Sequence, residues 1–106
     1  MFKVKDPRGI TVSLSRVCWN NHIIPEHPIM KHFHKEIKQT LEDPDCIFQS
    51  KISKTSHLYF RGHTHFKYGH FYLLVVVEIK VHHGYVKTSF PVYNLSKGGE
   101  LLWKKD

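Results

Sequence analysis

The spacing of hydrophobic and polar positions changes near residue 45, and this change divides the chain into a helical part and a strand-rich part. Before the helices, residues 10–14 alternate between apolar and polar side chains, which predicts a short strand. Ser15 is then a suitable N-cap for a short helix that runs to about Ile24. We expect this helix to end at Pro25, because the residue before a proline disfavours the helical conformation.

The second predicted helix has the clearest pattern in the chain. Its apolar stripe recurs at every fourth position and consists of Ile29, Phe33, Ile37 and Leu41. Such a stripe is typical of an amphipathic helix that packs one side against a core. Pro28 suits the first helical position, and the acidic, proline-containing segment 42–45 is expected to end the helix.

The pattern after Pro44 predicts consecutive strands. These cover residues 46–52, 57–61, 71–81 and 85–93, with a last short strand at 100–104. A tight turn at 82–84 joins the third strand to the fourth, and Pro91 places the end of the fourth strand at an edge or a bulge. Three polar segments, 50–56, 62–70 and 96–99, are expected to be loops. Helices followed by strands indicate an α+β fold, an antiparallel sheet with helices packed on one face.

Length and composition limit the class of protein. The 106 residues are 41% hydrophobic, which favours a single folded domain spanning residues 1–106 over a disordered chain. No apolar run is long enough for a membrane helix. The first six residues lack the apolar segment of a secretory signal, so we expect a cytoplasmic protein without a membrane partner. Cys18 and Cys46 are expected to be reduced thiols.

The balance of charges points to an acidic partner. Sixteen Lys and Arg residues face nine Asp and Glu residues, which gives a net charge of +7, and ten histidines add positive charge in mild acid. A small protein with this charge is expected to bind a polyanion, most often nucleic acid and less often an acidic protein. Solubility alone is the simpler explanation of the same charge.

Alternation along the strands predicts which side chains face away from the helices. Leu58 and Phe60 should cover the helices, while Tyr59 points to the other side. Applied to three strands, this rule predicts an exposed surface that contains His57, Tyr59, Arg61, Glu78, Lys80, Tyr85, Lys87 and Ser89. Cations on this surface can bind phosphate and tyrosine rings can stack on bases. The alternative is an ordinary solvated face with charge pairs such as Glu78 with Lys87.

Other kinds of site have weaker support. The pairs His63/His65 and His32/His34 place imidazoles two residues apart, but no third and fourth ligand follows at a recognisable spacing. We therefore expect no metal site and no cofactor. The chain contains no G-x-S-x-G motif for a nucleophilic serine and no glycine-rich phosphate loop.

Five short motifs resemble a known family. Residues 19–24 (WNNHII) and the following His27-Pro28 are similar to a W-x-x-H-I-x-x-x-H-P-E signature, and residues 37–45 (IKQTLEDPD) contain a TLxxPD stretch. Residues 58–61 (LYFR), 72–78 (YLLVVVE), 86–91 (VKTSFP) and 97–103 (KGGELLW) resemble the strands LYYR, YLVVVVK and VxTAYP…KGGELLW. Together they resemble small stand-alone members of the barnase–EndoU–colicin-D–RelE (BECR) ribonuclease superfamily, especially its phage-associated branches.

This resemblance implies a fold and an activity. It implies one or two N-terminal helices packed on one face of a four- to five-stranded antiparallel sheet. It also implies metal-independent RNA cleavage, in which the ribose 2′-hydroxyl attacks the phosphate and leaves a 2′,3′-cyclic phosphate, often in a toxin held by an antitoxin. Two positions depart from the signature: Glu26 stands where such proteins often have Arg, and Ile29 where they often have Glu. If that Arg binds the phosphate in the family, this chain either uses another cation or has lost the activity.

The residue chemistry suggests a role for each candidate. The candidate catalytic residues are His22, His27, Tyr59, Arg61, Thr88 and Ser89, and the candidate substrate-binding residues are His57, Lys80, Tyr85 and Lys87. His22 or His27 would act as the general acid or base. Arg61 would stabilise the phosphate, Tyr59 would stack on a base or donate a proton, and the two hydroxyls would bind phosphate oxygens.

Two other functions remain open at this stage. One is a basic nucleic-acid-binding module without catalysis, which would bind RNA or DNA in a salt-dependent way and leave it intact. The other is a domain whose positive face docks an acidic protein such as an antitoxin or inhibitor. RNA is the expected partner of the ribonuclease and of the binding module, and an acidic protein is the expected partner of the docking domain.

Overall fold

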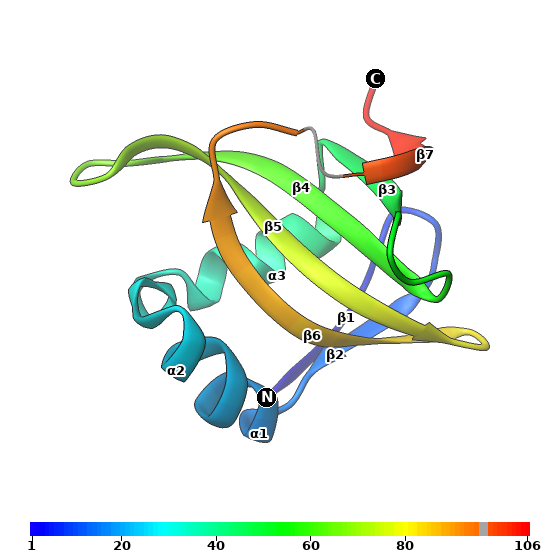
Figure 1. Cartoon of the computed structure of the whole chain (residues 1–106), viewed down its shortest axis with the longest axis horizontal. Helices are drawn as coiled ribbons and strands as arrows, with labels where there is room; N and C mark the ends of the chain where they lie inside the picture. Colours follow the sequence, from blue (N-terminus) through cyan, green and yellow to red (C-terminus); the bar gives the residue numbers. More distant parts are fainter. Residues whose placement is uncertain (96–97) are drawn as a thin grey trace.

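The protein is built on one seven-stranded mixed sheet that is mostly antiparallel (Figure 1). The computed structural model describes residues 1–95 and 98–106. In chain order the strands are β1 (Phe2–Lys5), β2 (Thr11–Leu14), β3 (Cys46–Ser50), β4 (Ser56–His65), β5 (Gly69–Lys80), β6 (His83–Val92) and β7 (Gly98–Lys104). Their order across the sheet is β1-β2-β6-β5-β4-β3-β7, and only β2 and β6 are parallel neighbours. The predicted α+β class is confirmed. The prediction of a purely antiparallel sheet of four to five strands is wrong, because the sheet is larger and contains one parallel pair.

The helices lie on one face of this sheet. The first helical segment runs through α1 (Arg16–Cys18), the π-helical η1 (Trp19–Ile23) and α2 (Ile24–Glu26). The second comprises the 3₁₀-helical η2 (Pro28–His32) and α3 (His34–Glu42). In Figure 1 α3 passes behind β4 and β5, and α1 and α2 lie beside β6. The side of the sheet that faces the viewer in Figure 1, without helices, is called the open face below.

The first helical segment begins as predicted but ends later. The Ser15 Oγ accepts a hydrogen bond from the Cys18 N–H at 3.0 Å, so the N-cap is confirmed. The predicted end at Pro25 is wrong, because helical structure continues to Glu26. Pro25 lies in the first turn of α2, directly after the π-helical turn, where a missing N–H is tolerated.

The apolar stripe of the second helix is confirmed. Phe33, Ile37 and Leu41 are fully buried, and Ile29 is half-buried. The helix begins at Pro28 as expected, but its first turn is 3₁₀-helical and the backbone leaves helical geometry at Phe33. The stripe thus spans two short helices rather than one.

Three strand predictions need correction. The polar segment 62–70 was expected to be a loop, but β4 and β5 extend into it and pair as far as His65 with Gly69. The turn is made possible by Gly69, whose φ of +73° favours glycine. Strand β1 was not predicted. Of the expected loop 96–99, Ser96 and Lys97 lie outside the described residues, and Gly98 and Gly99 belong to β7.

The turn predicted at 82–84 lies instead at 81–82, because His83 and Gly84 already pair in β6 with Lys80 and Ile79. The remaining strand predictions hold. The stretch at 10–14 forms β2, the loop at 50–56 joins β3 to β4, and the last strand at 100–104 is part of β7. Pro91 lies where β6 is an edge strand, because β2 pairs only with residues 83–85 of β6. Both Cys18 and Cys46 are free thiols.

Apolar side chains cover both faces of the sheet. The larger cluster lies under the helices and includes Val12, Ile23, Phe33, Ile37, Leu41, Ile47, Tyr59, Leu73, Val75 and Val77. The smaller cluster lies on the open face and includes Cys46, Leu58, Phe60 and Leu74, packed by Phe48, Val76, Phe90 and Leu95. Leu58 and Phe60 therefore point away from the helices, and the predicted orientation of β4 is wrong. Among the described residues, no helix has the length and apolarity needed to cross a membrane.

Candidate functional site

Tyr59 is buried on the helix side of the sheet and is part of a polar network. Its hydroxyl donates a hydrogen bond to Asp6 Oδ2 at 2.6 Å and accepts one from Arg8 Nη2 at 2.9 Å. The same guanidinium nitrogen lies 3.1 Å from His57 Nδ1. Burial and the Asp6 carboxylate raise the pKa of Tyr59. Tyr59 and His57 thus anchor the β1–β2 turn to β4, and the prediction that they line an exposed surface is wrong.

Asp6 is the centre of this network, and no sequence motif predicts its role. Its carboxylate accepts the backbone N–H groups of Arg8 and Ile10 at 2.8 and 3.0 Å, besides the Arg8 and Tyr59 side chains. The sequence Asp-Pro-Arg-Gly at 6–9 is a turn signal, and Gly9 has a φ of +88°. That signal predicts a turn but not the strand on which the turn rests.

The half-buried position of His57 predicts a stability change in mild acid. Burial and the neighbouring Arg8 lower the pKa of His57 below its ordinary 6.5, so the unfolded chain takes up a proton that the folded chain resists. The free energy of unfolding should therefore fall as the pH is lowered from 7.5 to 5.5. The free energy of unfolding, measured by urea denaturation at each pH in this range, should depend less steeply on pH in His57→Gln than in the wild type.

A second histidine contributes to the same slope. Burial and, to a smaller extent, the charge of Arg61 also lower the pKa of His63. His57→Gln should therefore remove only part of the pH dependence of the free energy of unfolding. The exposed His82 serves as the control, and His82→Gln should leave the slope unchanged. A slope that His57→Gln does not alter would contradict the role assigned to its burial.

Arg61 and Ser89 also lie on the helix side. Arg61 Nη1 donates to the Asp43 carbonyl oxygen at 2.6 Å and to Asp43 Oδ2 at 2.8 Å, at the end of α3. The Ser89 hydroxyl is buried and donates to the Leu74 carbonyl oxygen at 2.8 Å. The prediction that both face the exposed surface is wrong, and both are occupied by internal contacts.

A β-bulge at Lys87 explains the error on β6. Val86 pairs with Val77 and Thr88 pairs with Val76, so Lys87 is the extra residue of β6. The bulge reverses the alternation, which places Val86 towards the helices and Thr88 on the open face. The Lys87 amine also reaches the open face, 3.6 Å from Glu78 Oε1. The alternative prediction of a Glu78–Lys87 charge pair is confirmed.

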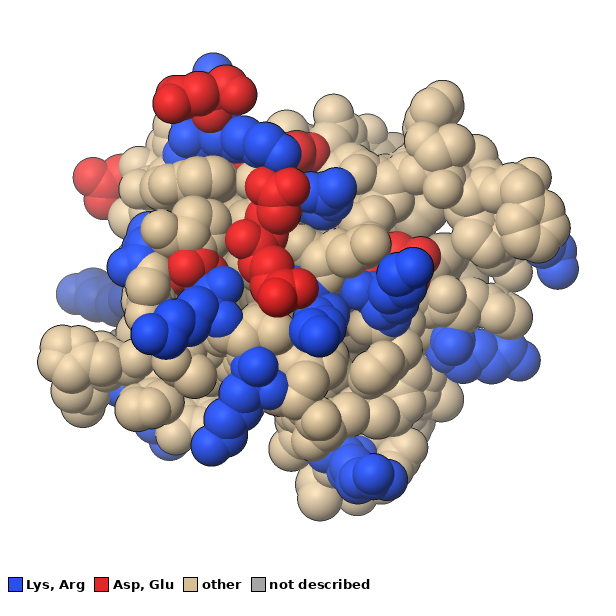
Figure 2. All heavy atoms as spheres, turned by 180° about the vertical axis from the view of Figure 1, so that it is seen from behind, with Lys and Arg blue, Asp and Glu red and all other residues tan. Residues whose placement is uncertain are grey.

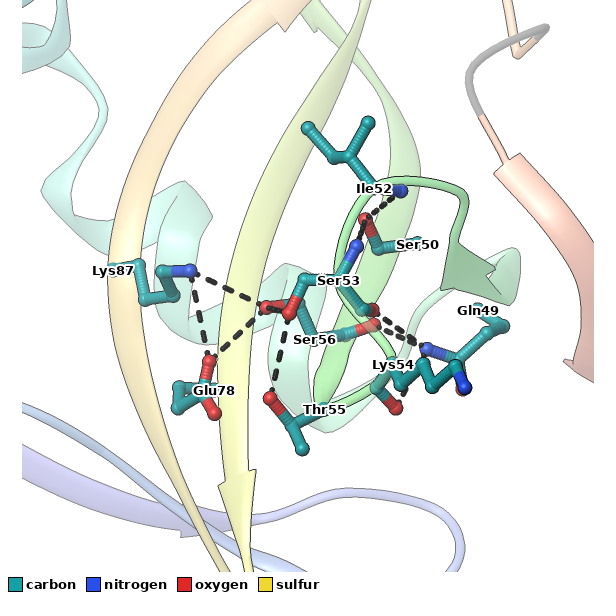
Figure 3. A network of polar contacts seen from close by, with 9 residues as sticks. All are labelled: Gln49, Ser50, Ile52, Ser53, Lys54, Thr55, Ser56, Glu78 and Lys87. Atoms are coloured by element: carbon teal, nitrogen blue, oxygen red, sulfur yellow. Dashed lines mark hydrogen bonds and ion pairs between the residues drawn. The ribbon is translucent and has the colours of Figure 1, made fainter.

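This charge pair lies at a hollow on the open face. The hollow has a volume of about 370 Å³, and its floor is formed by Leu58, Leu74, Val76 and Phe90. At its rim the Ser56 hydroxyl donates to Glu78 Oε1 at 3.1 Å and accepts from Lys87 Nζ at 3.3 Å (Figure 3). Hydrogen bonds from Thr55 and Ser56, together with Lys87, hold the pKa of Glu78 below its usual value.

The β3–β4 loop forms one wall of the hollow and is held by side chains. Gln49 Nε2 lies within 3.1 Å of the carbonyl oxygens of Ser53, Lys54 and Ser56 (Figure 3). The Ser50 hydroxyl accepts the N–H groups at positions 52 and 53 at 3.2 Å each. These contacts hold Ser56 beside the Lys87 amine. Neither Gln49 nor Ser56 carries a sequence motif that would have predicted this role.

His27 contacts Phe90, one of the residues that line this hollow, from the helical side. Its imidazole stacks on Phe90 with ring centroids 4.8 Å apart and an interplanar angle of 29°. Thr88 lies two residues before Phe90 on the same side of β6, about 6.5 Å along the strand. The Thr88 hydroxyl oxygen is enclosed and has no hydrogen-bond partner among the residues that the structure describes. An imidazole, a cation and an unpaired hydroxyl are thus gathered along β6.

The other three candidate residues, Tyr85, Lys80 and His22, do not line the hollow. Tyr85 is paired with Glu78 on the open face and is half exposed. Lys80 is exposed at the end of β5. His22 is exposed on η1, where its Nδ1 lies 3.9 Å from Glu26 Oε1. The open face therefore gathers His27, Lys87, Thr88 and Tyr85, but not the full predicted set.

Charge is distributed unevenly along the chain. Residues 46–95, which include β3 to β6, contain six Lys and Arg residues and only one acid, Glu78. Six of the nine acids lie before residue 46. On the helix-covered side, which Figure 2 shows, acidic side chains gather between scattered basic ones. The excess of positive charge thus belongs to the strands that carry the open face.

The histidine pairs have other contacts. His63 Nε2 lies 3.0 Å from Thr40 Oγ1, and His65 stacks on Phe66. Across residues 1–95 and 98–106, no group of three or more His, Cys, Asp or Glu side chains is placed to hold a metal ion.

Comparison with protein-family models, with curated proteins and with solved structures finds no match.

Proposed function

We propose that this protein is an endoribonuclease that binds single-stranded RNA on the open face and cleaves it without a metal ion. In this reaction the ribose 2′-hydroxyl attacks the adjacent phosphorus and the 5′-oxygen leaves, which yields a 2′,3′-cyclic phosphate. The observation that carries the proposal is the stacking of His27 on Phe90, which lines the hollow that Lys87 also lines. The motifs around Trp19, His27 and Thr88 resemble those of BECR ribonucleases and support the same activity.

Each residue has a role that its position allows. His27 takes the proton from the 2′-hydroxyl or gives one to the leaving oxygen, since an imidazole can do either near neutral pH. His22, five residues earlier, is the second imidazole of the same segment. Lys87 balances the negative charge that grows on the phosphate oxygens, whereas the enclosed Thr88 hydroxyl is out of reach of a phosphate on the surface. Tyr85 can stack on an unpaired base.

The contacts of the hollow prepare Lys87 for this task. Glu78 and Ser56 hold the amine at the rim, while nearly half of the Lys87 side chain remains exposed to a ligand. A phosphate that approaches the amine would compete with the Glu78 carboxylate. Lys87 thus replaces Arg61 as the expected phosphate-binding cation, because Arg61 is paired with Asp43.

The direct test is incubation of the purified protein with single-stranded RNA in the presence of EDTA. We expect shortened RNA whose new 3′ ends carry a 2′,3′-cyclic phosphate. A co-purified acidic protein would mask the activity, so the sample should first be shown to contain this chain alone. RNA that stays intact at high protein concentration would contradict the proposal.

A second candidate function is RNA binding without cleavage. It is favoured by the internal contacts of Tyr59, Arg61 and Ser89, which remove three predicted catalytic groups from the open face. In that case the RNA stays intact, and its affinity falls steeply as salt is raised. An acidic antitoxin is a further partner that we propose for the same face, since its carboxylates would occupy the position of the phosphates.

A further inference from the structure

The far end of the β4–β5 hairpin extends beyond the rest of the sheet (Figure 1). Strand β3 pairs with β4 only up to Phe60, and β6 pairs with β5 only from Tyr72. Residues 63–70 of the described chain therefore form a two-stranded ribbon with no neighbouring strand, which we call the β4–β5 arm. Such a ribbon is stabilised only weakly by its own backbone pairing.

Aromatic rings cover the end of this arm. Phe66 is 97% exposed, and its ring stacks on His65 with centroids 4.6 Å apart and an interplanar angle of 25°. The His65 ring lies 4.9 Å from that of Tyr68, and the Lys67 amine lies 5.5 Å from the Tyr68 ring centroid. The rings thus form one stack whose outermost member, Phe66, has an open face. Exposed aromatic rings of this kind are typical platforms for nucleic-acid bases.

The arm itself is basic, because residues 63–70 carry Lys67 and three histidines and no acid. The Asp45 carboxylate lies at the base of the arm, where it accepts the Gly62 N–H at 2.7 Å. The adjoining η2 places His32 near the arm, with its ring centroid 6.1 Å from that of Tyr68. Lys31 precedes His32 in the same turn of η2. An aromatic platform amid cations suits a strand that has both exposed bases and phosphates. A membrane surface fits less well, because the arm offers one exposed apolar ring rather than a broad apolar face.

We infer that the β4–β5 arm binds unpaired bases of a single-stranded RNA. One base stacks on the open side of Phe66, and the neighbouring phosphate pairs with Lys67. The inference rests on the proposed function for the choice of RNA as the ligand. It places a binding surface on the arm, apart from the hollow lined by Phe90 and Lys87.

Fluorescence anisotropy with a labelled single-stranded RNA of about ten nucleotides tests this inference. Loss of one stacked base reduces affinity about 5- to 150-fold, so Phe66→Ala should raise the Kd by a factor in that range. Phe66→Trp should retain the affinity, because it preserves the platform. Because Phe66 is nearly fully exposed, its replacement should leave the thermal unfolding of the protein unchanged.

The control is an exposed apolar residue at the other end of β5. Val81 is 87% exposed in the β5–β6 turn, and Val81→Ala should leave the Kd unchanged. Lys67→Gln should reduce the salt dependence of binding by about one phosphate contact. Equal affinity of the wild type and Phe66→Ala for the single strand would overturn the inference. So would a Phe66-dependent binding to phosphatidylserine vesicles in place of RNA.

The outcome separates this inference from the proposed function. If a dinucleotide substrate is cleaved equally by the wild type and Phe66→Ala while the longer RNA binds more weakly to the variant, both hold. If RNA is never cleaved but Phe66→Ala still weakens its binding, the arm stands and the nuclease fails. If cleavage occurs and the affinity does not depend on Phe66, the nuclease stands and the arm fails.

Discussion

Replacement of Asp6 by alanine should destabilise the protein by about 3 kcal/mol, at the low end for loss of one partner of a buried ion pair. The Asp6 side chain is fully buried and accepts hydrogen bonds from the Arg8 guanidinium and the Tyr59 hydroxyl. It also accepts two backbone N–H groups of the β1–β2 turn. Alanine leaves the Tyr59 hydroxyl and the two backbone N–H groups without their acceptor, whereas Arg8 keeps its contacts with Tyr59 and His57 and is partly exposed to water. The free energy of unfolding, measured by urea denaturation with circular dichroism, tests this expectation.

An exposed carboxylate provides the matched control. Asp43 pairs with Arg61 and Lys105, but half of its side chain is exposed to solvent. Asp43→Ala should therefore cost less than about 1 kcal/mol, as exposed ion pairs usually do. If Asp6→Ala does not fold, Tyr59→Phe gives a milder test and should cost about 1–2 kcal/mol. Equal losses for Asp6→Ala and Asp43→Ala would show that the network does not hold the turn on the sheet.

Local patterns predicted the helices because burial of a helix depends on its own periodicity. Phe33, Ile37 and Leu41 recur at a spacing that places them on one side, and all three are buried. The N-cap at Ser15 was equally predictable, since its hydrogen bond closes within three residues. These features need no knowledge of the rest of the chain.

The faces of β4 could not be predicted in this way. Leu58 and Phe60 alternate with Tyr59, and all three are buried, because the sheet has an apolar cluster on each side. Which set faces the helices is decided by the partner of the tyrosine hydroxyl, Asp6, more than fifty residues earlier. A strand pattern contains no information about such a distant partner.

The composition of the hollow depended on a second non-local feature. One extra residue at Lys87 shifts the register of β6 against β5. The side chains of Lys87 and Thr88 therefore both lie on the open face, while Ser89 is buried. A bulge leaves no clear mark in a single sequence. The position of His27 against Phe90 likewise depends on how the two helical segments pack beside β6. The sequence indicated the residue types of the candidate site, but not which of them meet.

Substitution of His27 should have the largest effect on RNA cleavage. Loss of a general acid or base lowers a reaction rate by about 10²–10⁴-fold, so His27→Ala should reduce kcat within that range. The structural explanation, loss of the ring that packs on Phe90, is tested by His27→Phe, which keeps an aromatic ring there but cannot transfer a proton. Both variants should lose kcat to a similar extent, while the KM for a short RNA stays close to that of the wild type.

The controls for His27 separate chemistry from charge and from folding. His82 is exposed in the β5–β6 turn, remote from Phe90 along the strand, and His82→Ala should cleave RNA at the wild-type rate. Lys87→Ala should also lower kcat, because it removes the cation at the rim of the hollow, whereas Lys54→Ala should not. Retention of full activity by His27→Phe would remove the imidazole from the mechanism. The stacking on Phe90 would then be packing alone, and the reaction would need a proton-transfer group elsewhere on the open face.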